Sequence, residues 1–236
     1  MYDVKNFKFD SEACWFKANC SNYKTEECNC GCSIYCQFYY LVNLANIPTK
    51  LQYAENQKLY PGADLQKYKY LKDIKDNIVE WVLEGSNLFL YSQYYGNGKT
   101  TWAIKLMCAY FAKIWNGNGT KCRGLLINVD DFLMQKKSQI DRKDSRFKEM
   151  EKLIADVDLV IWDDIGCTRL SDFEHSILFP LINSRIINEK ANIFTSNVID
   201  EDFVSNVGGR LASRILETSA IVEFNNPPQR KVRGLR

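Results

Sequence analysis

The feature that most constrains this chain is a short polar loop between an apolar run and an amphipathic helix, at residues 87–101. Leu88–Tyr91 predicts a buried strand, and the helix is expected to begin at Lys99. Between them, Gly96 and Gly98 allow the backbone to turn its amides toward an anion. The first turn of the helix adds unpaired N–H groups and the positive end of its dipole. Together these features predict a phosphate-binding loop.

The usual spacing of such a loop is G-x-x-x-x-G-K-[ST]. Gly98, Lys99 and Thr100 fill the last three positions, whereas Gln93 stands where the first glycine is expected. Lys99 is expected to reach the β- and γ-phosphates of ATP, and the Thr100 hydroxyl to bind Mg²⁺. The alternative is an ordinary strand–turn–helix connection with a chance Gly-Lys-Thr, but the order of strand, loop and helix favours the phosphate loop. The predicted nucleotide contacts are Gly96, Asn97, Gly98, Lys99, Thr100 and Thr101 from the loop, with Asp163 from a later strand.

Composition narrows the class of protein. The chain has 236 residues, of which 46% are hydrophobic, and this suits one α/β domain with a small appendage. The formal net charge of +2 provides no strong overall field for nucleic acid or an anionic membrane. No apolar run approaches the roughly 18–20 residues that span a bilayer, and the N-terminal residues lack the apolar core of a signal peptide. We therefore expect a cytoplasmic protein that does not bind membranes.

Six of the nine cysteines fall within residues 14–36. Thiols stay reduced in the cytoplasm, where such a cluster more often binds a metal than forms disulfides. Four thiolates satisfy a tetrahedral Zn²⁺, which supplies folding energy to a segment too short for a core of its own. An iron–sulfur cluster, and free thiols or disulfides, are the alternatives. The candidate ligands, of which four would bind, are Cys14, Cys20, Cys28, Cys30, Cys32 and Cys36. The remaining Cys108, Cys122 and Cys167 are expected to be small core residues.

Composition and helical periodicity divide the chain into three parts. Residues 1–50 form the Cys-rich module, 51–62 a linker and 63–236 the main α/β domain.

Basic residues within 131–156 alternate with acidic ones, which favours a solvated helix face over a nucleic-acid contact surface. The predicted strands are 88–91, 124–129, 159–162, 192–197 and 220–224; the predicted helices are 65–82, 99–114, 131–156, 173–186 and 208–216.

Two carboxylates directly follow the apolar run at residues 159–162. Open α/β sheets bind their ligands at the carboxyl ends of the strands, so Asp163 and Asp164 are expected to face the phosphate loop. Asp163 would hold Mg²⁺ through water, and Asp164 would orient or deprotonate the attacking water. The alternative is a helix cap or turn. Asn197, at the end of a later strand, is expected to hydrogen-bond the γ-phosphate or this water, with a turn-forming Asn as the alternative.

Residues 60–230 resemble the AAA+ ATPases, and among them the DnaC/DnaI-type loaders of the replicative helicase. Beyond the phosphate loop, the resemblance rests on the order and spacing of Ile127–Leu133, Val160–Gly166, Ile193–Asn197 and Gly209–Ile215. It implies a P-loop AAA+ parallel sheet flanked by helices, and the few residues after the last strand imply that the C-terminal lid of most AAA+ proteins is missing. The small Cys-rich N-terminal module would bind zinc.

The resemblance also implies a function, namely ATP-dependent loading of the replicative hexameric helicase onto single-stranded DNA. Lys99 and Thr100 correspond to the Walker A pair. Asp163 and Asp164 correspond to the Walker B pair, and Asn197 to the sensor residue.

An arginine finger is implied at Arg214, with Arg210 as the second choice. Such a finger completes the ATP site of a neighbouring subunit, so the resemblance implies a homo-oligomer. Residues 131–156 occupy the place where these loaders insert helices that touch single-stranded DNA. The Cys-rich module corresponds to the region that contacts the helicase.

Three rival functions remain open at this point. An IstB-like ATPase partner of a transposase shares the same motifs. A nucleotide-binding adaptor that barely hydrolyses ATP is suggested by Gln93 in place of glycine and by Asp164 in place of the commoner Glu. A metal-sensing regulator would require activity that follows the occupancy of the cysteines.

Overall fold

The computed structural model describes residues 9–12, 14–52, 64–114, 121–138 and 145–225. Its centre is a five-stranded parallel sheet in the order β2-β3-β4-β1-β5. All five predicted strands are present, and their ends differ from the prediction by one residue at most. The strands are β1 (Asn87–Tyr91), β2 (Gly124–Asn128), β3 (Leu159–Asp163), β4 (Ala191–Ser196) and β5 (Ser219–Glu223).

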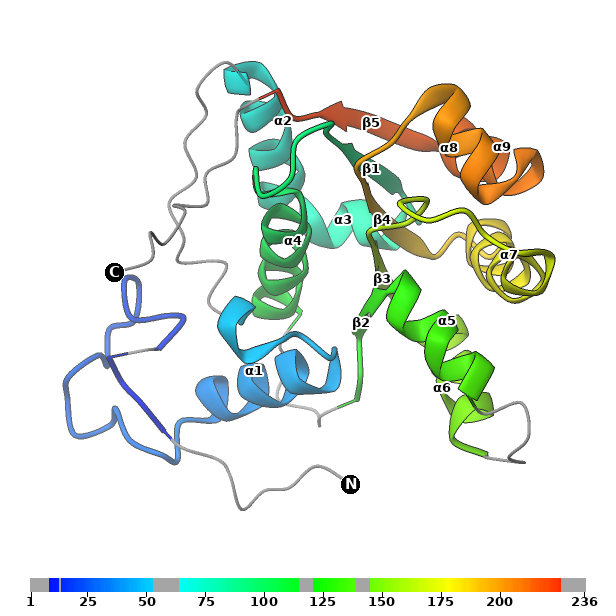
Figure 1. The fold of residues 1–236 in the computed structure, drawn as a ribbon. Helices are drawn as coiled ribbons and strands as arrows, with labels where there is room; N and C mark the ends of the chain where they lie inside the picture. The colour runs from blue at the N-terminus through cyan, green and yellow to red at the C-terminus, as the bar shows by residue number, and fades with distance from the viewer. Residues whose placement is uncertain (1–8, 13, 53–63, 115–120, 139–144, 226–236) are drawn as a thin grey trace, which may run out of the picture.

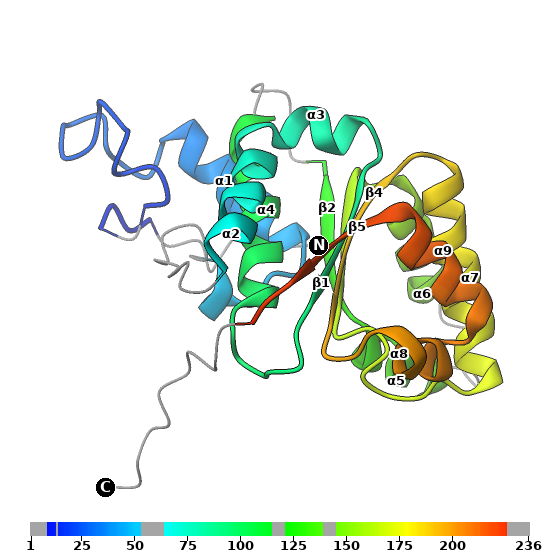
Figure 2. The same cartoon turned by 90° about the horizontal axis from the view of Figure 1, so that it is seen from above.

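Helices cover both faces of this sheet (Figures 1 and 2). On one face lie α1 (Ser33–Leu44), α2 (Leu65–Asp76), α3 (Ile78–Leu83) and α4 (Lys99–Lys113), and a 3₁₀ turn spans Thr49–Leu51. On the other face lie α5 (Val129–Ser138), α6 (Ser145–Asp156), α7 (Asp172–Ile187), α8 (Asp200–Val207) and α9 (Gly209–Thr218). The predicted architecture of a parallel sheet flanked by helices is confirmed.

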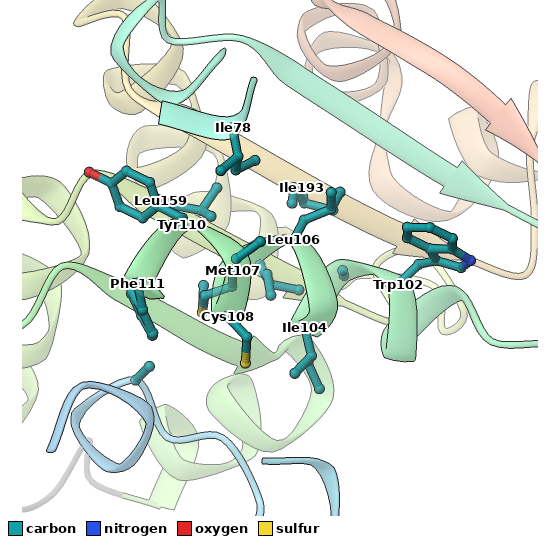
Figure 3. Close-up of a cluster of buried hydrophobic side chains, with 14 of the residues drawn as sticks. Ile78, Trp102, Ile104, Leu106, Met107, Cys108, Tyr110, Phe111, Leu159 and Ile193 are labelled. Atoms are coloured by element: carbon teal, nitrogen blue, oxygen red, sulfur yellow. The ribbon is translucent and has the colours of Figure 1, made fainter. Parts of the chain in front are cut away.

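The sheet is buried on both faces, which explains why β1 and β3 contain apolar runs of four residues without polar alternation. In β1, Leu88 and Leu90 pack into the core on the α4 side, whereas Phe89 and Tyr91 pack into the core on the opposite side. Figure 3 shows the side chains of α4 gathered with Leu159 of β3 and Ile193 of β4. The helix that follows the phosphate loop is therefore fixed directly against the centre of the sheet.

The parallel register brings the carboxyl ends of neighbouring strands to one edge. Tyr91 at the end of β1 lies opposite Ser196 of β4 and Glu223 of β5. Asp163 ends β3, the next strand beyond β4. Segments far apart in sequence therefore leave the sheet side by side at this edge.

Two predicted helices are interrupted. The helix expected over 65–82 breaks at Asn77, which separates α2 from α3. The Asn77 side chain donates to the Asp73 carbonyl at 3.1 Å, a local bond of the kind by which Asn competes with helix continuation. The helical segment expected over 131–156 consists of α5 and α6, and residues 139–144 between them lie outside the described part.

The N-terminal segment packs on the α/β domain through α1. This helix contacts α4 and β2, and the Leu126 amide of β2 donates to the Ala45 carbonyl at 2.8 Å. Trp15 packs on Tyr35 and Phe38, with ring centroids 5.1 and 4.8 Å apart. The module expected over residues 1–50 thus includes a helix that shares the main hydrophobic core.

The expectation of a missing C-terminal lid concerns residues 226–236, which lie outside the described part of the chain. Within the described residues, none of the helices is both long enough and apolar enough to cross a membrane.

Candidate nucleotide site

The phosphate loop connects β1 to α4 and contains two glycines in left-handed conformations. The φ angles are 72° at Gly96 and 104° at Gly98, where a side chain would be strained. Gln93 has no positive φ, and its side chain is exposed. The backbone conformation at the position of the expected first glycine is therefore one that glutamine adopts without strain. Thr101, another predicted contact, lies half-buried in the first turn of α4.

The side chain of Lys99 extends along the carboxyl edge of the sheet toward the end of β4. Its side chain is 5% exposed, and Nζ donates to Asn197 Oδ1 at 2.6 Å and to the Tyr94 carbonyl at 3.2 Å. Burial lowers the pKa of the Lys99 ammonium, while the nearby Asp164 carboxylate acts in the opposite direction. Both hydrogen-bond acceptors of Lys99 are neutral oxygens. Phosphate oxygens can replace them, and their negative charge pairs more strongly with the Lys99 ammonium.

Thr100 and Asp163, predicted from separate motifs, meet directly. The Thr100 hydroxyl donates to Asp163 Oδ1 at 2.8 Å. The Thr195 hydroxyl of β4 donates to the same oxygen at 2.7 Å. Asp163 is 9% exposed, so these two hydroxyls fix its carboxylate at the edge of the sheet. Hydroxyl and carboxylate oxygens are the ligand types that Mg²⁺ prefers, and the pair fits this ion.

Thr195 is a site residue that the sequence did not single out. Besides bonding Asp163, its hydroxyl accepts a hydrogen bond from the Asp164 amide at 2.9 Å, and its carbonyl accepts one from the Ile165 amide at 2.9 Å. The available signal was a hydroxyl residue near the end of a strand whose residues are all buried. Its partners became visible only once β4 was placed beside β3.

Asp164 adopts a left-handed backbone conformation, with φ of 58°. Non-glycine residues in this region cost on the order of 1–3 kcal/mol, less for Asp than for most, and the bond to Thr195 holds the strained peptide in place. The Asp164 side chain is half-buried and close enough to Lys99 to affect its pKa. The second predicted carboxylate therefore belongs to the same site.

Asn197 lies between Lys99 and Cys167. Its Oδ1 accepts from Lys99, and its Nδ2 donates to Cys167 Sγ at 3.6 Å. The prediction of Cys167 as a core residue is wrong, because the chain turns after β3 and leaves this thiol half-buried at the site. Burial raises the pKa of the Cys167 thiol, which favours its neutral form.

The two candidate finger residues lie on α9 and are exposed. The Arg210 guanidinium lies over the Phe179 ring, 4.8 Å from its centroid. Arg214 lies one turn further along the helix. Neither arginine is part of the hydrogen-bonded set formed by Lys99 and Asp163 within one chain.

The six N-terminal cysteines occupy a segment built mainly of turns, and all are free thiols. Burial raises the pKa of Cys14, and the neighbouring thiols of Cys32 and Cys20 raise it further, so these side chains lie within electrostatic reach of one another. In the described part of the chain, however, no group of three or more His, Cys, Asp or Glu side chains is arranged to hold a metal ion. The predicted zinc site is therefore not formed by these side chains as they stand.

Several solved structures share this fold. The DnaC helicase loader superposes with a TM-score of 0.60 and 19% identity, over 73% of this chain and 96% of that chain. DnaI superposes with a TM-score of 0.58 and 17% identity, over 75% and 94%. Domain III of the Thermotoga maritima replication initiation protein DnaA gives 0.56 and 20%, over 74% and 67%. At these identities the similarity establishes a shared fold.

Family membership follows from the sequence itself. Comparison with curated proteins gives no match. A profile of the family described as IstB-like ATP binding protein matches residues 37–233, which includes the phosphate loop, both carboxylates and Asn197. The chain therefore belongs to the IstB-like ATP-binding protein family and is an ATPase.

Proposed function

We propose that this ATPase is a loader that places a replicative hexameric helicase on single-stranded DNA during replication initiation in the cytoplasm. The observation that carries the proposal is the site of Lys99, Thr100, Asp163 and Asn197, assembled on a fold that matches the DnaC helicase loader over 96% of its length. The likeness to DnaI over 94% of that chain supports the same choice.

Each site residue has a role in this proposal. Lys99 exchanges its bond with Asn197 for the β- and γ-phosphate oxygens. Thr100, and Asp163 through water, hold Mg²⁺, which neutralises phosphate charge when bound. Asp164 orients or deprotonates the attacking water. Asn197, released by Lys99, hydrogen-bonds the γ-phosphate or that water. The remaining proposed phosphate contacts are Gly96, Asn97, Gly98 and Thr101.

Arg214 is proposed to act in the site of a neighbouring subunit, so that the protein works as a homo-oligomer. Both α9 arginines are exposed, as a group acting on another chain must be. Arg210 already packs on Phe179, which favours Arg214 as the finger and keeps Arg210 as the second choice. A charge supplied by a neighbour would make hydrolysis depend on assembly.

Residues 1–50 are proposed to dock the helicase, with 51–62 as a linker to the ATPase domain at 63–236. The packing of α1 on α4 supports coupling between helicase docking and nucleotide binding, because α4 begins at Lys99. Residues 131–156 are proposed to contact the single-stranded DNA.

We also propose that four of the six N-terminal thiols bind Zn²⁺ after moving closer together. The supporting observation is that the Cys32 and Cys20 thiols lie close enough to Cys14 to raise its pKa further, beyond the effect of burial. Elemental analysis of the purified protein tests this, with a Cys14→Ser, Cys32→Ser variant as the comparison. One zinc per chain, lost in the variant, supports the proposal; iron would indicate an iron–sulfur cluster, and no metal would refute it.

Co-purification with the replicative helicase of the same host tests the loader function. The complex is measured with ATP and with ADP, for the wild-type protein and for Lys99→Ala. We expect a complex whose stability depends on the nucleotide in the wild type and loses this dependence in the variant. Absence of a complex with either nucleotide would refute the loader function while leaving the ATPase assignment intact.

DNA and turnover measurements separate the rival functions. The loader should bind single-stranded DNA in preference to duplex, whereas a preference for duplex would indicate a transposase partner. ATP turnover that single-stranded DNA stimulates would exclude a passive adaptor. Turnover that stays near zero under every condition would favour the adaptor.

A further inference from the structure

The phosphate loop is tied to the end of β5 by the buried side chains of Ser92, which precedes the loop motif, and Asn97, which occupies one of its variable positions. The Ser92 hydroxyl donates to the Phe224 carbonyl at 2.7 Å and accepts a hydrogen bond from the Tyr94 amide at 3.1 Å. Asn97 Nδ2 donates to the same Ser92 hydroxyl and to the Phe224 carbonyl at 3.4 Å. We call Ser92, Asn97 and the Phe224 carbonyl the loop clamp.

The loop clamp sits on a rigid base. The Ser92 amide donates to the Ser196 carbonyl at 3.2 Å, and the Phe224 amide donates to the Tyr91 carbonyl at 2.7 Å. These bonds continue the sheet beyond the ends of β4, β1 and β5. Just beyond Phe224, the Asn225 amide donates to the Asp64 carboxylate at 2.9 Å. The Phe224 carbonyl is therefore held from both sides.

Burial shows that the clamp is part of the interior. Ser92 is 0% exposed and Asn97 is 6% exposed. Asn97 Oδ1 is buried and has no hydrogen-bond partner among the described residues. An unsatisfied buried acceptor costs free energy, so a residue that only filled space here would be apolar. The side-chain N–H donor of Asn97 therefore explains why a polar residue stands at this buried position.

The clamp also accounts for the missing first glycine. Gln93 lies between Ser92 and Tyr94, and the hydrogen bond from the Tyr94 amide to the Ser92 hydroxyl spans it. The Gln93 side chain is exposed. The shape of the loop is thus set by side-chain bonds at its two ends together with Gly96 and Gly98. Freedom of the backbone at residue 93 is not required.

We propose that Ser92 and Asn97 are positioning residues for nucleotide binding: by fixing both ends of the loop to β5, they hold its amides in the arrangement that receives the phosphates. A loop ordered beforehand spares the ligand the entropy cost of ordering it, so that loosening the clamp lowers nucleotide affinity. The proposal goes beyond helicase loading and depends only on ATP binding at this loop.

The test compares ADP affinity in Ser92→Ala with that of the wild-type protein, by titration with a fluorescent ADP analogue. Nucleotide binding by the wild type is established first, so that failure of the ATP site itself is seen separately. Loss of the hydroxyl should weaken binding about tenfold or more, the change expected from losing at least one net hydrogen bond. Ser92→Thr keeps the hydroxyl and should restore most of the affinity.

A matched control lies at the other end of the same strand pair. Asn87 Nδ2 of β1 donates to the Thr218 hydroxyl just before β5, at 3.4 Å. Thr218→Ala removes this link and the bond from the Thr218 hydroxyl to the Arg214 carbonyl at 2.6 Å, neither of which involves the loop. It should leave the ADP affinity within about twofold of the wild type, which is less than the loss of one net hydrogen bond would produce.

Wild-type affinity in a folded Ser92→Ala protein would overturn the proposal. Equal losses in Ser92→Ala and Thr218→Ala would also overturn it, because they would indicate general loosening of the β1–β5 pair. If Ser92→Ala does not fold, Asn97→Ala is measured by the same criteria.

Discussion

Arg185 of α7 is a buried cation whose removal should destabilise the whole fold. Its side chain is 1% exposed, and burial lowers the pKa of the guanidinium to about 9. The group reaches the amino ends of β3 and β4 from the face covered by α7. Its hydrogen-bond acceptors, at 2.6–3.2 Å, are Asn192 Oδ1 and the carbonyls of Ile154, Val157, Asp158 and Ala191.

The size of the effect follows from these five acceptors. Arg185→Met keeps most of the apolar volume but removes every donor. A buried acceptor left unsatisfied costs about 1–3 kcal/mol, and the lower end applies where a carbonyl keeps a second partner. Arg185→Met also removes the free-energy cost of burying a positive charge, which offsets part of the loss of stability. We expect a net loss of about 3–5 kcal/mol, because several neutral acceptors lose their donor at about 1–3 kcal/mol each and the removal of the buried charge offsets part of that sum.

Urea unfolding followed by circular dichroism measures this loss. A domain of this kind has about 5–15 kcal/mol of stability in total, so the midpoint should fall sharply. Arg169→Met, at an exposed position, is the control and should stay within about 0.5 kcal/mol of the wild type. A loss below about 1 kcal/mol in Arg185→Met would show that the carbonyls find other partners, and would refute the reasoning.

Three predictions concern the site. Lys99→Ala should abolish nucleotide binding in a titration, whereas Lys113→Ala, exposed at the far end of α4, should bind normally; unchanged affinity in Lys99→Ala would contradict the loop assignment. Arg214→Ala should bind ATP but not hydrolyse it, and mixing it with Asp164→Asn should restore some turnover; no recovery would argue against a finger supplied by a neighbour. Thr195→Val should lower kcat about tenfold or more with little change in nucleotide affinity, because the strained Asp164 peptide loses its acceptor; an unchanged kcat would remove Thr195 from the site.

Much of the site could be read from local sequence, because its parts are short and continuous. The phosphate loop lies within residues 87–101, and its glycines are needed at the positions where the backbone has positive φ. Asp163 and Asp164 were predicted to face it because parallel strands end at one edge, and the Thr100–Asp163 bond confirms this for Asp163. The break at Asn77 was missed, since apolar spacing continues across it.

The sequence by itself determined the five strands, the class of fold and the short motifs that supply Lys99, Thr100 and Asp163 to one edge of the sheet. Only the tertiary structure decided the order of the strands, and with it the roles of residues with no local signal. Thr195 bonds Asp163 because β4 lies next to β3, and Ser92 reaches the Phe224 carbonyl because β5 lies next to β1. Periodicity reports which face of an element is buried, but not which element covers it. Hydrogen bonds between distant segments depend on which element covers the buried face.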